Sequence, residues 1–211
     1  MLFRSLTATA LTLSSTQTVT QSQKIAVTGL ELLGSGTFTL TNTGSANAVT
    51  TLAANAGVVS FTQSTAYAVG TVNSTVGLTT TGNLALVGSG GITLGANVSS
   101  GAGTQTYTGP ITLSTGAITI ASTDAAITFS GSTTKINGAQ ALTINSGNAR
   151  ITFGGVIGDV TPISSLTLQG TGDNYLPSAL TATGNIDLKG SSRATPLQVN
   201  STITKIGRAH V

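Results

Sequence analysis

The sequence predicts an all-β protein built as a β-solenoid with coils of irregular length. Three observations support this. Triads of an apolar, a small polar and an apolar residue recur along the chain, Gly and Asn interrupt every candidate helix, and Gly-rich or Pro-containing segments separate the triads. Because one triad is too short to bury its apolar face alone, the triads must stack as coils that cover one another.

Each triad is expected to be a short strand whose two outer residues face the interior and whose middle residue faces solvent. In chain order the triads are Leu11–Leu13, Phe38–Leu40, Leu84–Leu86, Ile92–Leu94, Ile111–Leu113, Ile118–Ile120, Ile127–Phe129, Leu142–Ile144, Ile151–Phe153, Leu166–Leu168 and Ile186–Leu188. A coil of about 20 residues, at the short end of known repeat periods, predicts about ten coils. With ~4.8 Å between stacked strands, the rod is about 50 Å long.

The segments between triads are expected to form the corners of the coils. Gly can adopt the positive φ of tight bends, and Pro is tolerated beside strands, which suits Gly88–Gly91, Gly101–Gly103, Gly154–Gly155, Pro110, Pro162, Pro177 and Pro196. Seven Asn residues fall at strand edges: Asn73, Asn83, Asn97, Asn137, Asn145, Asn148 and Asn185. If they face inward at equivalent corners, they can stack in a hydrogen-bonded ladder.

The composition suits one repeat region that spans residues 6–204 and belongs to a longer array. Charged residues make up 6% of the 211 residues and hydrophobic ones 39%, which is not the composition of a disordered chain. The chain has no Cys, which excludes disulfides and thiolate metal sites. No apolar run approaches the ~18 residues of a membrane helix, so no transmembrane segment is expected.

The two ends, residues 1–5 and 205–211, are predicted to be a sequencing-adapter artefact. DNA strings that can encode Met1–Ser5 and Lys205–Val211 are reverse complements of each other and match an adapter read from both sides. Setting these ends aside removes three of the eight basic residues and leaves as many basic as acidic side chains. Nucleic acid is therefore not an expected partner.

Several segments carry a strand-entry pattern of the type Tyr-x-Gly-x-Val-x-Leu or a repeat with Asn-x-Val and Leu-Ala. They are Gln105–Leu113, Ile151–Gly158, Ile163–Leu168, Leu30–Leu40 and Asn47–Ala53. Over roughly residues 16–199 the chain resembles the filamentous-haemagglutinin-like, two-partner-secretion exoproteins, which are large repetitive bacterial adhesins. The resemblance implies a right-handed parallel β-helix, export through an outer-membrane partner barrel, and a role in adhesion or surface-matrix formation. The amino-terminal secretion domain of that family is not recognisable here.

A polysaccharide-active β-helix enzyme of the lyase or glycosidase type is the first alternative, because such enzymes use clustered carboxylates. The acids outside the terminal segments are Glu31, Asp124, Asp159, Asp173 and Asp187, and Asp159 and Asp173 are about one coil apart. We interpret all five as solvated loop acids. Arg150, Lys189 and Arg193 are too scattered for an anion site, and the only His, His210, lies in a terminal segment.

Other binding chemistries are not favoured. The calcium-binding nonapeptide is absent, since Gly90-Gly91 and Gly154-Gly155 lack the following Gly and Asp. An ice-binding face would need Thr pairs in register, and uneven spacing argues against it for Thr37/Thr39, Thr104/Thr106, Thr106/Thr108 and Thr181/Thr183.

Phe residues within triads are expected in the core, and Tyr107 and Tyr175 at corners. No catalytic, cofactor-binding or metal-binding residue is predicted, and no cofactor.

The sequence thus favours a non-catalytic structural or adhesive rod of a bacterial exoprotein. It is expected outside the cell, secreted or held at the bacterial surface. Expected partners are host-cell or matrix glycans and proteins, and an outer-membrane secretion partner for the full-length protein. Besides the enzyme, a self-assembling extracellular matrix protein is an alternative, since open strand edges promote association.

Overall fold

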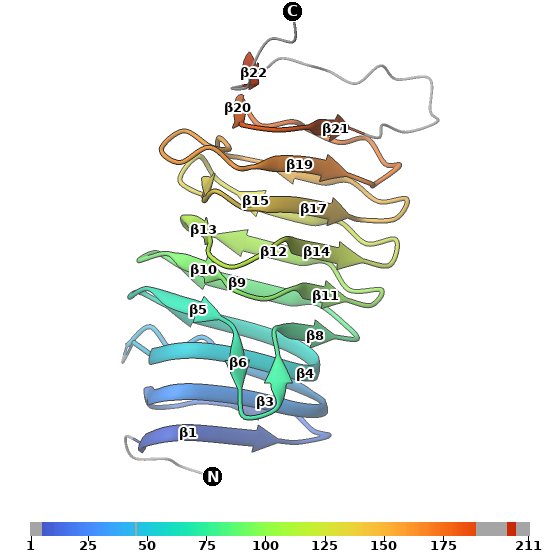
Figure 1. Cartoon of the computed structure of the whole chain (residues 1–211). Coiled ribbons are helices and arrows are strands. Elements are labelled where there is room, and N and C mark those ends of the chain that lie inside the picture. The colour runs from blue at the N-terminus through green and yellow to red at the C-terminus, as the bar shows by residue number, and fades with distance from the viewer. Residues whose placement is uncertain (1–5, 45, 189–201, 206–211) are drawn as a thin grey trace, which may run out of the picture.

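The computed structural model describes residues 6–44, 46–188 and 202–205, with side chains described within 8–44 and 46–188. The chain forms a right-handed parallel β-solenoid, as predicted, and makes about eight turns. In Figure 1 the N-terminal coil lies at the bottom and the chain climbs coil by coil toward the C-terminus. No helix occurs among the described residues.

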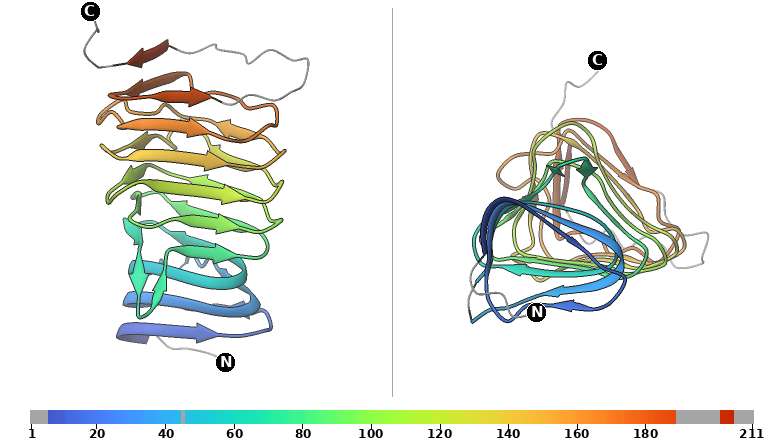
Figure 2. Two further views of the ribbon diagram at one scale, coloured as in Figure 1. Left: turned by 45° about the vertical axis from the view of Figure 1, so that its right-hand side comes forward. Right: turned by 90° about the horizontal axis from the view of Figure 1, so that it is seen from below.

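The cross-section of the rod is a rounded triangle (Figure 2), and the strands of successive coils stack into three faces. The first face stacks β5 (Tyr67–Val69), β10 (Ile92–Leu94), β13 (Ile111–Leu113), β16 (Ile136–Asn137), β20 (Ala179–Ala182) and β22 (Thr202–Lys205). The second stacks β8 (Leu78–Thr80), β11 (Val98–Ser100), β14 (Ile118–Ser122), β17 (Ala141–Asn145), β19 (Ser165–Leu168) and β21 (Ile186–Leu188). The third stacks β9 (Leu84–Gly88), β12 (Gln105–Thr108), β15 (Ile127–Ser130) and β18 (Ile151–Phe153).

The N-terminal coils differ because their strands continue around the corners. β1 (Leu6–Ser14) and β2 (Val19–Thr20) both pair with β3 (Ile25–Leu40), which pairs along its length with β4 (Ala48–Gln63). β4 then pairs in turn with β5, β8 and β9, so this one strand contributes to all three faces. Between β5 and β8, β6 (Thr71–Val72) and β7 (Thr75–Val76) form an antiparallel hairpin.

The core consists of columns of apolar side chains in register on successive coils. On the third face, one column runs from Leu40 through Phe61, Leu86, Tyr107 and Phe129 to Phe153. The rings of Tyr107 and Phe129 stack at 5.1 Å between centroids, and those of Phe129 and Phe153 at 5.0 Å. Every triad from Phe38 to Leu168 has its two outer residues buried, which confirms the predicted inward face.

The predicted coil of about 20 residues was too short for most turns. Residues paired between consecutive coils are from 17 positions apart, as at Thr51 and Ala68, to 25 positions apart, as at Ile111 and Ile136. The chain therefore makes about eight turns instead of ten. The extra residues sit at the corners, while the strands stay in register.

The Asn residues do not form the ladder that inward positions at equivalent corners would allow, because their side chains bind other groups at the corners. Asn83, before β9, accepts a hydrogen bond from the Thr104 backbone N–H, and Asn97, before β11, accepts one from the Thr119 N–H. A column of hydroxyls takes the place of the ladder at the inner corner after the second face. Each hydroxyl donates to a carbonyl two or three residues further on: Thr80 to Gly82, Ser100 to Gly103, Ser122 to Ala125 and Ser146 to Ala149.

Candidate functional site

The acidic side chains are dispersed along the rod. Asp159 follows Ile157, which pairs with β16 and β20 on the first face, whereas Asp173 precedes Tyr175, which pairs with Thr152 on the third face. The two carboxylates therefore occupy different corners, and they do not form the carboxylate pair that the enzyme alternative would require. Asp187 lies in β21, exposed and in register with Thr167. Lys189 and Arg193 lie outside the described residues.

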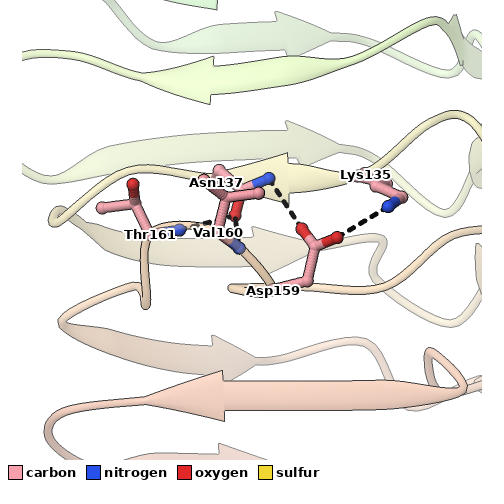
Figure 3. Close-up of polar contacts among 5 residues, drawn as sticks. All are labelled: Lys135, Asn137, Asp159, Val160 and Thr161. Atoms are coloured by element: carbon pink, nitrogen blue, oxygen red, sulfur yellow. Dashed lines mark hydrogen bonds and ion pairs between the residues drawn. The ribbon is translucent and has the colours of Figure 1, made fainter.

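Asp159 links its corner to the preceding coil through side-chain hydrogen bonds (Figure 3). Its carboxylate accepts hydrogen bonds from Lys135 Nζ at 2.7 Å and from Asn137 Nδ2 at 3.0 Å, and the Asn137 Oδ1 accepts the backbone N–H groups of Val160 and Thr161. The hydrogen bond from Lys135, followed by that from Asn137, lowers the pKa of Asp159. Both carboxylate oxygens are thus engaged, and the arrangement suits fastening better than proton transfer.

Replacing Lys135 by Met is expected to lower the free energy of unfolding by about 1 kcal/mol or less, because the pair is solvent-exposed. The side chains of Lys135 and Asp159 are 46% and 28% exposed. Since the pKa of Asp159 is lowered in the folded state, its contribution is present at neutral pH and lost as the pH falls through that lowered pKa. Urea unfolding of the parent and of Lys135→Met at neutral and acidic pH measures the difference in their free energies of unfolding. A difference at neutral pH several times larger than about 1 kcal/mol would contradict the prediction.

A second corner holds Asp124, Asn148 and Thr171 on successive coils. The Asn148 backbone N–H donates to Asp124 Oδ1 at 2.7 Å, and the Thr171 hydroxyl donates to Asn148 Oδ1 at 2.7 Å. Here too the carboxylate links neighbouring coils and does not meet a second carboxylate. Nearby, the Arg150 guanidinium lies over the ring of Tyr175, 4.7 Å from its centroid.

Glu31 is not the solvated loop acid that was predicted, because it lies in the middle of β3 and is almost fully buried. Its neighbours Leu30 and Leu32 are buried in the core, so Glu31 faces outward, yet only 4% of the residue is exposed. The β6–β7 hairpin covers it. The turn-forming Asn73 and Ser74 between two Val residues could have indicated a hairpin, but not the strand against which it packs.

The middle residues of the triads form outward columns of small side chains. On the third face, Thr106, Thr128 and Thr152 are in register, with Thr108 beside Ser130. On the second face, Thr119, Thr143 and Thr167 are in register. Uneven spacing along the sequence therefore does not exclude alignment, because the corners absorb it.

The aromatic residues divide differently from the prediction. Phe38, Phe61, Phe129 and Phe153 are buried, as expected of triad residues and strand interiors. Tyr107 is fully buried in the aromatic column, where its hydroxyl donates to Gln105 Oε1 at 2.6 Å, so the expected corner position is wrong. Tyr175 does lie outside the core and is 54% exposed.

A hollow at the N-terminal coil is lined by apolar and neutral polar side chains and one cation, Lys24: Leu11, Leu13, Val19, Thr20, Gln21, Ser22, Gln23, Ile25 and Leu40 complete its lining. It lacks the paired carboxylates that glycoside hydrolysis usually requires.

Within the described residues, no group of three or more His, Cys, Asp or Glu side chains is arranged to hold a metal ion. The same part of the chain contains no helix long and apolar enough to cross a bilayer. Comparison of the chain with known proteins yields no matching family model, no matching curated protein and no matching solved structure.

Proposed function

We propose that this chain is a non-catalytic structural or adhesive rod of a bacterial exoprotein, secreted or displayed at the cell surface. The observation that carries the proposal is the dispersal of the acidic side chains together with the uncharged outward surface of the third face. Asp124 and Asp159 are each held at a different corner by hydrogen bonds to a neighbouring coil, whereas the outward columns of β12, β15 and β18 bear small uncharged side chains. Such a surface offers repeated weak contacts and no single reaction centre.

Any binding is then spread along the rod. Hydroxyls of Thr106, Thr128 and Thr152 can donate and accept hydrogen bonds, which suits glycans or protein backbones of a host cell or matrix. The resemblance to filamentous-haemagglutinin-like exoproteins, and the outer-membrane secretion partner that it implies, belong to the same proposal.

Deleting one whole coil tests the proposal. Because Gln105 and Ile127 are in-register partners, removing residues 105–126 joins Thr104 to Ile127 and should keep every remaining strand in register. We expect a folded rod shortened by about 4.8 Å in small-angle scattering, with binding to host cells or matrix reduced in proportion to length.

The matched control deletes residues 105–115, about half a coil, which should disrupt the register and abolish folding. Both proteins and the parent are also incubated with a polysaccharide panel. If the parent releases new reducing or unsaturated ends and the one-coil deletion does not, the rod proposal is wrong and the enzyme alternative is favoured. Growth of the parent into filaments in light scattering would instead favour the self-assembling matrix protein.

A further inference from the structure

The β6–β7 hairpin is the one antiparallel strand pair of the described chain. Its two short strands run along the axis of the rod, down the outside of the N-terminal coils (Figure 1). The hairpin closes where the Gly77 N–H donates to the Gly70 carbonyl at 2.8 Å, and its turn residue Asn73 has a φ of 51°. A segment that crosses several coils can tie them together from outside.

The surface beneath the hairpin is shaped to receive it. Val72 is only 5% exposed and packs over Gly29 of β3, where an added Cβ would lie 2.8 Å from Val72 Cγ1. Ala53 of β4, in register with Glu31, faces outward and is fully buried. Gly29 and Ala53 are thus two small residues at outward positions beneath the hairpin.

Glu31 joins three segments that are far apart in the sequence. Its Oε2 accepts hydrogen bonds from the Thr12 hydroxyl of β1 at 2.6 Å and from Asn73 Nδ2 at 2.7 Å, and its Oε1 accepts one from the Thr75 hydroxyl at 2.6 Å. Asn73 Nδ2 also reaches Thr12 Oγ1 at 3.2 Å. The groups that face the carboxylate are therefore Thr12 of β1, Asn73 and Thr75 of the hairpin and Ala53 of β4, none of which titrates.

We propose that the β6–β7 hairpin is an acid-released strap: the Glu31 carboxylate ties it to β1 and β3, and protonation of that carboxylate frees the hairpin and loosens the first coil while the rest of the rod stays folded. An ionised carboxylate accepts all three hydrogen bonds with both oxygens, and hydrogen bonds to a charged acceptor are about twice as strong as neutral ones. A protonated carboxyl has a donor where an acceptor is needed.

The direction of the pH effect follows from the same contacts. The hydrogen bond from Thr12, followed by those from Thr75 and Asn73, lowers the pKa of Glu31 from its ordinary value of 4.5. The strap is therefore at full strength above pH 4.5 and weakens as the pH falls through the lowered value. This behaviour does not depend on what the rod binds.

Hydrogen exchange of the full chain at pH 7 tests the strap. In Glu31→Ala, amides of residues 70–77 and 6–14 should exchange at least about tenfold faster than in the parent, whereas those of residues 84–153 should not change. Glu31→Gln, which mimics the protonated carboxyl, should also speed the exchange of these amides, but by a smaller factor than Glu31→Ala. Asp159→Asn is the matched control, since it neutralises a carboxylate at another corner and should leave both segments unchanged.

Acid release is measured by electron–electron distances between two spin labels. The chain has no Cys, so Ser74→Cys on the hairpin and Thr143→Cys on β17 can be labelled selectively. As the pH falls through the lowered pKa of Glu31, we expect a second, broader distance population while circular dichroism still reports the β-solenoid, and Glu31→Ala should show that population at pH 7 already. Unchanged exchange in Glu31→Ala, or a distance that changes only when the whole chain unfolds, would overturn the proposal.

Discussion

Replacing Phe129 by Ala is expected to lower the free energy of unfolding by about 3–5 kcal/mol. Phe129 is fully buried and lies between two rings, stacked on Tyr107 at 5.1 Å and on Phe153 at 5.0 Å. The substitution loses the transfer free energy of the ring, leaves a cavity and removes both stacking contacts. Since neighbouring rings belong to neighbouring coils, the cavity weakens two coil interfaces together.

The measurement is chemical denaturation of both proteins, followed by far-ultraviolet circular dichroism. Thr128→Ala is the matched control, because Thr128 is the adjacent residue on β15 but faces outward in the column of Thr106 and Thr152. It should change stability by about 0.5 kcal/mol or less. Equal effects of the two substitutions would mean that the inward and outward faces of β15 are assigned wrongly.

Replacing Gly109 by Ala is expected to cost about 3 kcal/mol or more, for two independent reasons. The residue has a φ of 112°, which L side chains rarely adopt. A Cβ there would also lie 2.0 Å from the Gly88 carbonyl oxygen of the preceding coil, and a backbone atom cannot move aside as a side chain can. The corner between β12 and β13 must therefore open or the coil must shift.

The control for Gly109 is Gly116→Ala, which keeps the chemical change and removes the clash. Gly116 has a φ of 59°, but nothing lies within 4 Å of its added Cβ. We expect a loss of about 1–2 kcal/mol from backbone strain alone. Thermal unfolding of the two variants separates backbone strain from the clash with the Gly88 carbonyl. If the Gly109 variant were no less stable than the Gly116 variant, the clash at this corner would be relieved at little cost.

The strands were predictable because the alternation within a single triad assigns each of its side chains to the core or to the surface. In Ile118-Thr119-Ile120, the alternation alone assigns the two Ile residues to the core and Thr119 to the surface, and the structure agrees. Tyr107 shows the limit of this reasoning. It was expected at a corner, although it stands between Thr106 and Thr108 just as a triad residue would. The buried side-chain amide of Gln105, which accepts a hydrogen bond from the Tyr107 hydroxyl, explains how this hydroxyl is satisfied inside.

The corners were less predictable because their length is not encoded in the strand pattern. A period of about 20 residues fitted Thr12 and Glu31 but missed the longer step from Gly109 to Thr134. Errors in the candidate site have the same origin. Asp159 and Asp173 seemed adjacent only under a fixed coil length, and the burial of Glu31 arises from a hairpin that packs on another coil, which local sequence does not reveal.

The step of 17 to 25 residues between paired residues of consecutive coils has a consequence for how the chain acquires its structure. Each coil needs only the one before it as a template, since the exposed edge of a finished coil presents the next segment with both its hydrogen-bonding groups and its apolar column. Folding of this kind is an elongation reaction, with one costly nucleation event followed by addition of successive coils. The chain could therefore fold progressively from one end as it emerges from a ribosome or a narrow channel, without waiting for its distant terminus.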